Sequence, residues 1–194
     1  MNTVQKSEAP ALTPQRPPHV LLGVTGSTAA SKAQAIALAL LRSGCEVRAA
    51  MTPSSQQFIQ PMLLASVLKD PVYSTLWSPT QAGETHVEWA RWADAMVIAP
   101  ATATCIADLW LGAYNNPVTL LAANVPPDRL FIAPGMAQQM WDQPAVRRNV
   151  AQLTEWGVRF LGPVTGRVAS GAEGQRLMEP RDIAAAVCEL RCEL

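Results

Sequence analysis

The stretch Ala95-Met-Val-Ile-Ala-Pro-Ala-Thr-Ala-Thr-Cys-Ile-Ala-Asp-Leu109 decides the fold of this chain. Its apolar half, Ala95 to Ala99, ends at a proline and is followed by small hydroxylated residues. The run Leu130 to Ala133 also ends at a proline. Uninterrupted apolar runs of this length are typical of parallel strands that are buried on both faces. Ligands of open α/β sheets bind beyond the carboxyl ends of such strands, so we expect a planar, polar cofactor beside Thr102 and Thr104.

Strand and helix patterns alternate on both sides of this stretch. The expected strands are His19 to Val24, Glu46 to Met51, Met96 to Ala99, Leu130 to Ala133 and Val158 to Leu161. The expected helices are Ala29 to Arg42, Gln56 to Leu68, a short helix that carries His86, Cys105 to Gly112, Val118 to Ala123 and Pro144 to Trp156. This alternation predicts an α/β fold: a single doubly wound parallel sheet, Rossmann-like or flavodoxin-like, with helices on both faces.

The ends of the chain and one internal connection lack such a pattern. Residues 1–18 are polar and proline-rich, so we expect a disordered amino-terminal arm, without a signal peptide, before a single domain at 19–194. No apolar segment is long enough to span a membrane, and cytoplasmic localisation is the simplest expectation. The connection from Val164 to Pro180 carries several glycines and is a candidate flap over a substrate, because long connections inside compact domains are usually binding loops.

The composition excludes several function classes. Of the 194 residues 49% are hydrophobic and 15% charged, and the formal net charge is zero, which provides no basic surface for nucleic acid. Low charge together with six tryptophans predicts apolar surface that is covered in a homo-oligomer. The cysteines lack the spacing of a metal site, so we expect reduced thiols and no bound metal. They are Cys45, Cys105, Cys188 and Cys192.

The turn after the first strand, Gly26-Ser27-Thr28, stands directly before a predicted helix. Its backbone amides and hydroxyls can bind a phosphate group, helped by the positive end of the helix dipole. The spacing lacks the third glycine and the later acidic residue of a dinucleotide site, so a mononucleotide fits better. A tight turn of purely structural origin explains the same residues equally well.

Several motifs taken together resemble a known family, the homo-oligomeric flavin-containing cysteine decarboxylases, over His19 to Pro180. The motifs are Gly26-Ser27-Thr28, His86 ahead of Ala93-Asp94, Ala99-Pro-Ala-Thr-Ala-Thr104, Gly112 followed by Asn115-Asn116, Pro134-x-Met136 with Met140-Trp141, and Met178-Glu-Pro180. The family includes phosphopantothenoylcysteine decarboxylases and enzymes that oxidatively decarboxylate the C-terminal cysteine of lantibiotic-type precursor peptides. The resemblance implies that FMN is bound at subunit interfaces of a homotrimer or an assembly of trimers such as a homododecamer.

The resemblance also implies roles for individual residues. The residues expected to bind FMN are Gly26, Ser27, Thr28, Thr52, Phe58, Ala101, Thr102, Thr104, Cys105 and Met136. The residues expected to bind substrate are Asn116, Ala137, Met140, Trp141, Ser170 and Arg176. His86 is the expected catalytic residue, as a base for the thiol proton or as a stabiliser of developing charge.

Two departures from the family pattern bear on the reaction. Ala137 stands where the family has an asparagine that binds the substrate carboxylate, and Gln138 or Gln139 is a candidate substitute. Ser170 stands where the coenzyme A pathway enzymes have a cysteine whose proton lets the reduced flavin return its electrons. A hydroxyl is far less acidic than a thiol, so we expect the product to remain an aminoenethiol and an outside acceptor to reoxidise the flavin.

The leading hypothesis is therefore an FMN-dependent oxidative decarboxylase that acts on a cysteine carboxylate at the C terminus of a precursor peptide. The alternative is phosphopantothenoylcysteine decarboxylase of coenzyme A biosynthesis. A further alternative is a non-catalytic FMN-binding regulatory paralogue, because the equivalents of both the asparagine and the cysteine are missing.

Overall fold

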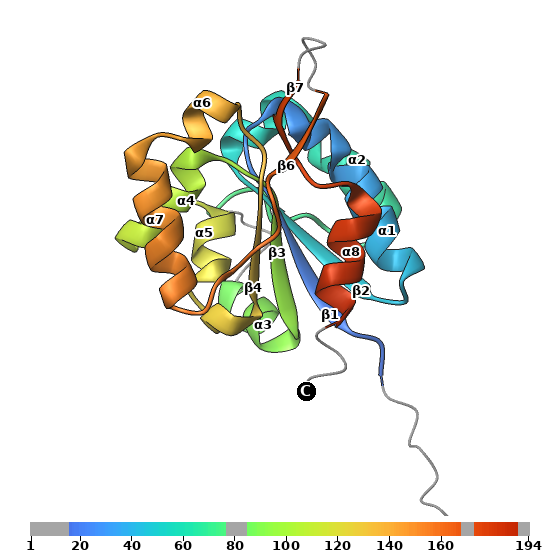
Figure 1. Cartoon of the computed structure of the whole chain (residues 1–194). Helices are drawn as coiled ribbons and strands as arrows, with labels where there is room; N and C mark the ends of the chain where they lie inside the picture. The colour runs from blue at the N-terminus through green and yellow to red at the C-terminus, as the bar shows by residue number, and fades with distance from the viewer. Residues whose placement is uncertain (1–15, 77–84, 168–172, 190–194) are drawn as a thin grey trace, which may run out of the picture.

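A computed structural model of the chain describes residues 16–76, 85–167 and 173–189. Its centre is a five-stranded parallel sheet with the order β2-β1-β3-β4-β5 (Figure 1). The strands are β1 (His19–Val24), β2 (Glu46–Met51), β3 (Ala95–Ala101), β4 (Leu130–Pro134) and β5 (Arg159–Phe160). This is the flavodoxin-like strand order, in which the chain reverses its winding direction between β1 and β3. The predicted fold class is confirmed.

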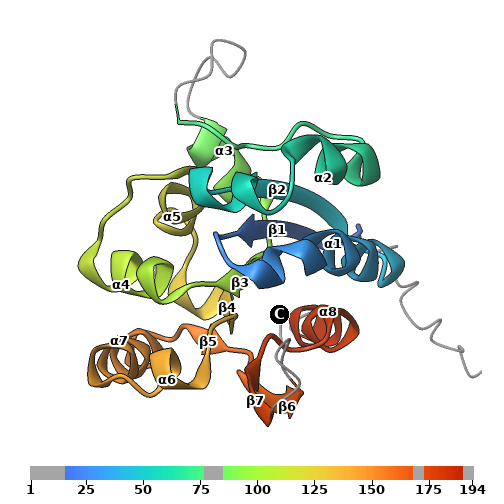
Figure 2. The same ribbon diagram turned by 90° about the horizontal axis from the view of Figure 1, so that it is seen from above.

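Helices cover both faces of the sheet (Figure 2). One face packs against α1 (Ala33–Arg42), α2 (Pro61–Leu68) and α8 (Pro180–Glu189). The other packs against α3 (Thr85–Trp92), α4 (Ala103–Leu111), α5 (Pro117–Ala122) and α7 (Pro144–Glu155). Side chains alternate between the two faces along each strand. Leu22 accordingly lies in the first hydrophobic cluster and Leu21 in the second.

The helix predicted over Gln56 to Leu68 is wrong in its extent. The structure has a short 3-10 helix η2 (Pro53–Gln57) and then α2, which begins at Pro61. Proline has no N–H to donate within a helix and is best accommodated in the first turn, so a continuous helix through Pro61 is unfavourable. The predicted helix Ala29 to Arg42 likewise begins as a 3-10 helix, η1 (Thr28–Lys32), that leads directly into α1. Two shorter elements are η3 (Pro127–Arg129) and α6 (Gln138–Trp141).

The connection predicted as a long loop contains a hairpin of β6 (Val164–Arg167) and β7 (Glu173–Arg176), paired antiparallel. These segments carry no strand pattern because they are short, polar and glycine-containing, without an alternation of apolar residues. In Figure 1 the hairpin lies at the upper end of the molecule with α6, whereas α3 lies at the lower end. Ser170 lies outside the described residues.

Candidate functional site

The carboxyl ends of β1 and β3 are joined by the hydroxyl of Thr25, which is 1% exposed. Its Oγ1 donates to the carbonyl oxygen of Pro100 at 2.7 Å and accepts from the backbone N–H of Thr102 at 3.0 Å. The backbone N–H of Thr25 also donates to Pro100, at 3.2 Å. Both strand ends flank the reversal point of the sheet, where ligands of this fold bind. No local pattern predicts this role of Thr25, because its partner Thr102 stands 77 positions further along the chain.

The end of β4 meets the glycine turn at the same edge of the sheet. Ser27 Oγ donates to the carbonyl oxygen of Gly135 at 2.9 Å and accepts from the N–H of Ala29 at 3.1 Å. The N–H of Gly135 donates to the carbonyl oxygen of Ala101 at 3.0 Å. Ser27 thus caps the start of η1 and also binds the segment at Gly135, which Met136 follows directly in the sequence.

The end of β2 completes this edge. The N–H of Thr52 donates to the carbonyl oxygen of Val24 at 3.0 Å, and Thr52 Oγ1 lies 3.0 Å from Ser54 Oγ. A Cβ at Gly26 would lie only 2.7 Å from Ser54 Cβ and 3.0 Å from its carbonyl carbon. Gly26 therefore permits the turn to approach η2 closely, which a larger residue would prevent.

The amino terminus of α4 also lies at this edge. Thr102 is its N-cap, with Oγ1 accepting from the N–H of Cys105 at 3.2 Å, and Thr104 in the first turn is exposed. The side chains of Ala101 and Cys105 are buried in the second hydrophobic cluster. Burial raises the pKa of Cys105 to about 12, so its thiol stays protonated and is unsuited to redox chemistry. The side chains of Ala101 and Cys105 therefore face the core, so these two residues would contact a ligand at this edge through backbone atoms only.

The groups at this edge fit FMN by their chemistry. Hydroxyls of serine and threonine and the backbone amides of two helix starts suit a phosphate and the polar atoms of a flat ring system. Apolar side chains that can cover such a ring stand beside them, with Met136 partly buried and Phe58 48% exposed. The structure thus brings together the expected cofactor residues of β1, β2, β3 and β4.

The expected substrate residues of the α6 region lie next to Met136. Ala137 and Met140 are exposed, while Trp141 is buried and carries the guanidinium of Arg147 4.9 Å above its ring centre. Asn116 is the N-cap of α5: its Oδ1 accepts from the N–H groups of Val118 and Thr119 at 3.0 and 3.1 Å. The oxygen of Asn116 is thus already used in capping, and its role toward substrate stays a prediction.

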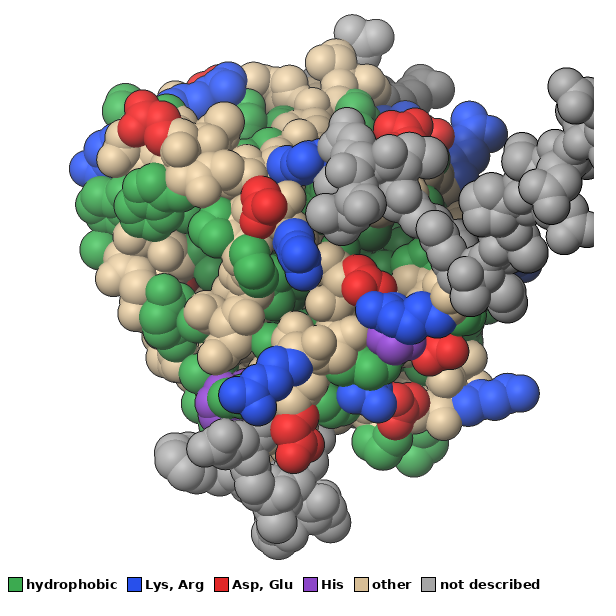
Figure 3. Space-filling model, turned by 90° about the horizontal axis from the view of Figure 1, so that it is seen from below, with side chains coloured by type: hydrophobic (Ala, Val, Ile, Leu, Met, Phe, Trp, Pro, Cys, Tyr) green, Lys and Arg blue, Asp and Glu red, His purple; other side chains and the backbone are tan. Residues whose placement is uncertain are grey.

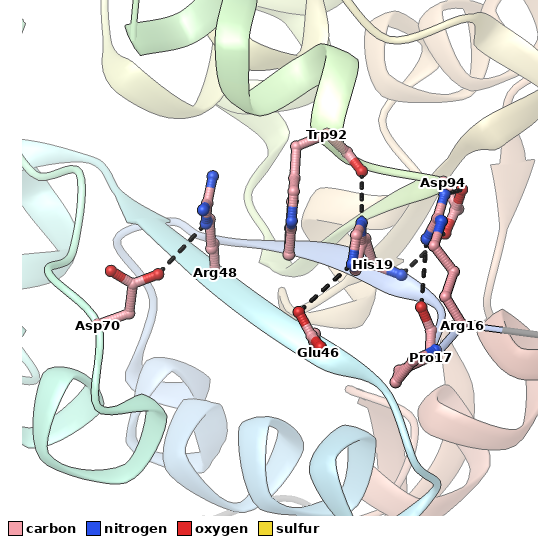
Figure 4. Close-up of polar contacts among 8 residues, drawn as sticks. All are labelled: Arg16, Pro17, His19, Glu46, Arg48, Asp70, Trp92 and Asp94. Carbon is pink, nitrogen blue, oxygen red and sulfur yellow. Dashed lines mark hydrogen bonds and ion pairs between the residues drawn. The ribbon is translucent and has the colours of Figure 1, made fainter.

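At the amino ends of the strands, α3 is fixed by a stack of side chains (Figure 4). The ring of Trp92 lies between the guanidinium of Arg48, at 4.3 Å, and the imidazole of His19, also at 4.3 Å and nearly parallel. His19 Nδ1 is 2.9 Å from the carbonyl oxygen of Trp92, and its Nε2 is 3.3 Å from Glu46. Asp94 pairs with Arg16, so the last residues of the predicted arm are bound to the domain. Acidic and basic side chains lie next to one another over this lower face (Figure 3).

This stack separates His86 from the other expected site residues. The strand β1 is extended from His19 to Val24 and covers about 17 Å, and the glycine turn lies beyond its carboxyl end. His86 stands six residues before Trp92, about 9 Å along the helix. Since Trp92 is held beside His19, His86 remains well short of the glycine turn of its own chain. The structure therefore does not bring the expected catalytic residue to the expected cofactor residues within one protomer.

The described residues bear on three further expectations from the sequence, which concern membrane-spanning helices, metal sites and the cysteines. None of the helices in the described ranges is long and apolar enough to cross a membrane. Residues 16–76, 85–167 and 173–189 contain no group of three or more His, Cys, Asp or Glu side chains that could hold a metal ion. The sulfur atoms of Cys45 and Cys188 lie 3.2 Å apart, whereas Cys192 lies outside the described residues.

Comparison with known proteins agrees with this geometry. A family model described as Flavoprotein matches residues 8–191. The chain is 35% identical over 175 residues to the coenzyme A biosynthesis bifunctional protein CoaBC of Haemophilus influenzae, and the match covers 88% of this chain and 43% of that protein. The chain thus spans less than half of the length of this curated relative.

Two solved structures are similar over nearly the whole chain. One is a cysteine-to-serine mutant of PPC decarboxylase complexed with pantothenoylaminoethenethiol, with a TM-score of 0.78 and 31% identity, covering 92% of this chain and 100% of that chain. The other is the FMN-dependent cysteine decarboxylase SpaF, with a TM-score of 0.75 and 30% identity, covering 90% and 97%.

Proposed function

The chain belongs to the Flavoprotein family and resembles its flavin-dependent cysteine decarboxylases, and from this premise we propose that it is an FMN-dependent decarboxylase of phosphopantothenoylcysteine. The observation that carries this proposal is the similarity to PPC decarboxylase, which covers that enzyme's whole chain. The relatedness to CoaBC proteins supports the same substrate. Phosphopantothenoylcysteine, the alternative substrate expected from the sequence, is thus better supported than a peptide that ends in cysteine.

A peptide ending in cysteine is the second candidate substrate, as expected from the sequence, and the similarity to the cysteine decarboxylase SpaF is compatible with either substrate. Both substrates present the same reacting group, a cysteine carboxylate beside a thiol-bearing carbon. Carbon dioxide leaves from this group only if the remaining electrons are delocalised. FMN, when bound, would accept the electrons of the thiol-bearing carbon and so provide that delocalisation.

The residues at the carboxyl edge of the sheet would hold the cofactor. The backbone amide and hydroxyl of Thr28 would bind its phosphate, with Ser27 holding the turn in place through its bonds to Gly135 and Thr25, and the start of α4 at Thr102 and Thr104 would bind polar ring atoms. Met140 and Trp141 would form an apolar wall beside the substrate. Arg176 would bind the substrate carboxylate through its guanidinium.

We infer that His86 acts in the site of a second copy of the chain. Its helix lies away from the glycine turn of its own protomer, and a homo-oligomer would bring it to the turn of a neighbour. Exposed large apolar side chains favour such an assembly, since Phe58, Met62 and Leu63 are 48%, 80% and 43% exposed around η2 and α2.

Mixed assemblies test this inference. The variants His86→Asn and Gly26→Val should each be inactive, the first through loss of the base and the second through loss of FMN. Co-expression should restore activity, because some sites then combine an intact turn with a neighbour's intact histidine. Co-expressed assemblies that stay inactive would contradict the assignment.

Product analysis tests the proposed function. The FMN-loaded protein is incubated with phosphopantothenoylcysteine and, separately, with short peptides that end in cysteine. The masses of the products are then measured by mass spectrometry. In the presence of dissolved oxygen as the final electron acceptor, we expect turnover of phosphopantothenoylcysteine with loss of carbon dioxide plus two hydrogens, because Ser170 replaces the cysteine expected to return the electrons. Loss of carbon dioxide alone would refute the role given to Ser170. Turnover of the peptide only would favour the second candidate, and no turnover of either would favour the non-catalytic alternative.

A further inference from the structure

Three charged side chains meet where the hairpin leads into the last helix. Glu179 Oε1 lies 3.6 Å from Lys32 Nζ and accepts a hydrogen bond from Arg176 Nη1. Lys32 is the last residue of η1, which begins directly after the glycine turn, and Arg176 is the last residue of β7. A single carboxylate therefore connects the expected cofactor turn with the hairpin.

Glu179 is the fixed member of this cluster. Its carbonyl oxygen accepts from the N–H groups of Asp182 and Ile183, both at 3.0 Å, and so starts α8. Ile183 is fully buried against α1, and Leu177 on the other side of Glu179 is 2% exposed in the same core cluster. Packing on both sides holds the backbone of Glu179 relative to the core, and hence to the start of α1.

Arg176, by contrast, depends on Glu179 for its direction. Its side chain crosses Gly166 of the paired strand, where a Cβ would lie 3.1 Å from Cδ and 3.2 Å from Cζ. Its Nε is buried and has no hydrogen-bond partner among the described residues. Among the described residues, the bond from Nη1 to Glu179 is thus the polar contact that orients the guanidinium, and the Nη groups carry further N–H donors that suit a second carboxylate.

The charges in the cluster keep this contact in place at neutral pH. Partial burial alone would raise the pKa of the Glu179 carboxyl, but the nearby charges of Lys32 and Arg176 lower it overall. Glu179 therefore stays ionised between two cations. A network of this kind restricts its members more than an isolated surface pair does.

We propose that Glu179 is a positioning residue. It orients Arg176 toward the substrate carboxylate and, through Lys32, couples the hairpin to the turn that holds the cofactor. The inference rests on the proposed function, in which Arg176 binds substrate. It assigns a role to Glu179, which the sequence shows only as part of the motif Met178-Glu-Pro180.

Amide hydrogen exchange tests the coupling without cofactor or substrate. In Glu179→Gln the described hairpin strands, 164–167 and 173–176, should exchange roughly two- to fivefold faster than in the unaltered protein, as expected for loss of an ion-pair contact. Asp182→Asn is the matched control, because it removes a neighbouring carboxylate that bonds only to Arg181 in the described structure. Equal exchange in the two variants would overturn the proposal, as would an equal increase in the core strand β3, which would indicate general destabilisation.

Steady-state kinetics of the FMN-loaded enzyme test the effect on Arg176. Glu179→Gln should raise KM for the substrate roughly two- to fivefold without lowering kcat, because the ion pair of Arg176 with the carboxylate stabilises the bound substrate and weakens as the carboxylate leaves as neutral carbon dioxide. In an Arg176→Ala background the same change should have no further effect on KM. An equal rise in KM without Arg176 would refute the positioning role. If the unaltered protein shows no turnover, the proposed function is refuted. The hydrogen-exchange comparison still tests in that case whether Glu179 couples the hairpin to the rest of the domain.

Discussion

Replacing Thr25 by valine removes one buried hydroxyl at the centre of the site and leaves the shape of the side chain almost unchanged. The carbonyl oxygen of Pro100 keeps a second donor, the N–H of Thr25 itself, whereas the N–H of Thr102 loses its acceptor. An unsatisfied donor of this kind costs about 1–3 kcal/mol. For a chain of this size each kcal/mol lowers Tm by roughly 2–4 °C.

Thermal unfolding and FMN titration measure the two consequences. Thr25→Val should lower Tm and weaken FMN binding, because the start of α4 is released at Thr102. Thr25→Ser is the control: it keeps the hydroxyl, loses one methyl group worth about 0.8 kcal/mol, and should bind FMN normally. A Thr25→Val protein that is as stable as the unaltered one and binds FMN equally well would refute the reasoning.

Three further variants or conditions follow from single contacts. Gly135→Ala should lower the free energy of unfolding by about 1–3 kcal/mol, since its Cβ would lie 2.6 Å from Pro100 Cβ; a denaturant titration without any shift would contradict this. Arg48→Met should cost about 0.5–1 kcal/mol, because it removes the cation over Trp92 and Trp89 together with the partly exposed ion pair to Asp70, whereas Arg181→Met, at an exposed position, should cost nothing measurable in the same titration. Cys105 should resist alkylation in the folded protein at neutral pH, and rapid labelling of the native protein at Cys105 would contradict its burial. Its raised pKa also means that the free energy of unfolding falls between about pH 9 and 12, because only the unfolded thiol ionises in that range.

The strand positions were predictable because the apolar runs are long and uninterrupted. The run His19 to Val24 is β1 with unchanged bounds, since burial on both faces leaves few alternatives for such a segment. Glu46 to Met51 is β2 with unchanged bounds although Glu46 and Arg48 interrupt its apolar residues, because β2 is an edge strand and Gly44 marks its start. The hairpin was not predictable, because β6 and β7 lack both apolar alternation and length.

The candidate site was predictable only as far as local patterns extend. Residues that follow strand ends, such as Ser27 and Thr102, could be assigned to one edge, because parallel strands bring their carboxyl ends together. Contacts across long sequence separations could not be foreseen, which is why the bond of Thr25 to Thr102 and the contact of Glu179 with Lys32 were missed. The separation of His86 from the turn depends on the stacking of Trp92 and His19, which no local pattern reveals.

The most direct test of the decarboxylase assignment is anaerobic addition of phosphopantothenoylcysteine to the FMN-loaded protein, with flavin absorbance and released carbon dioxide recorded together. The proposed chemistry predicts that the flavin band bleaches in step with carbon dioxide release and recovers when oxygen is admitted. An unchanged flavin spectrum without carbon dioxide, for this substrate and for peptides ending in cysteine, would contradict it.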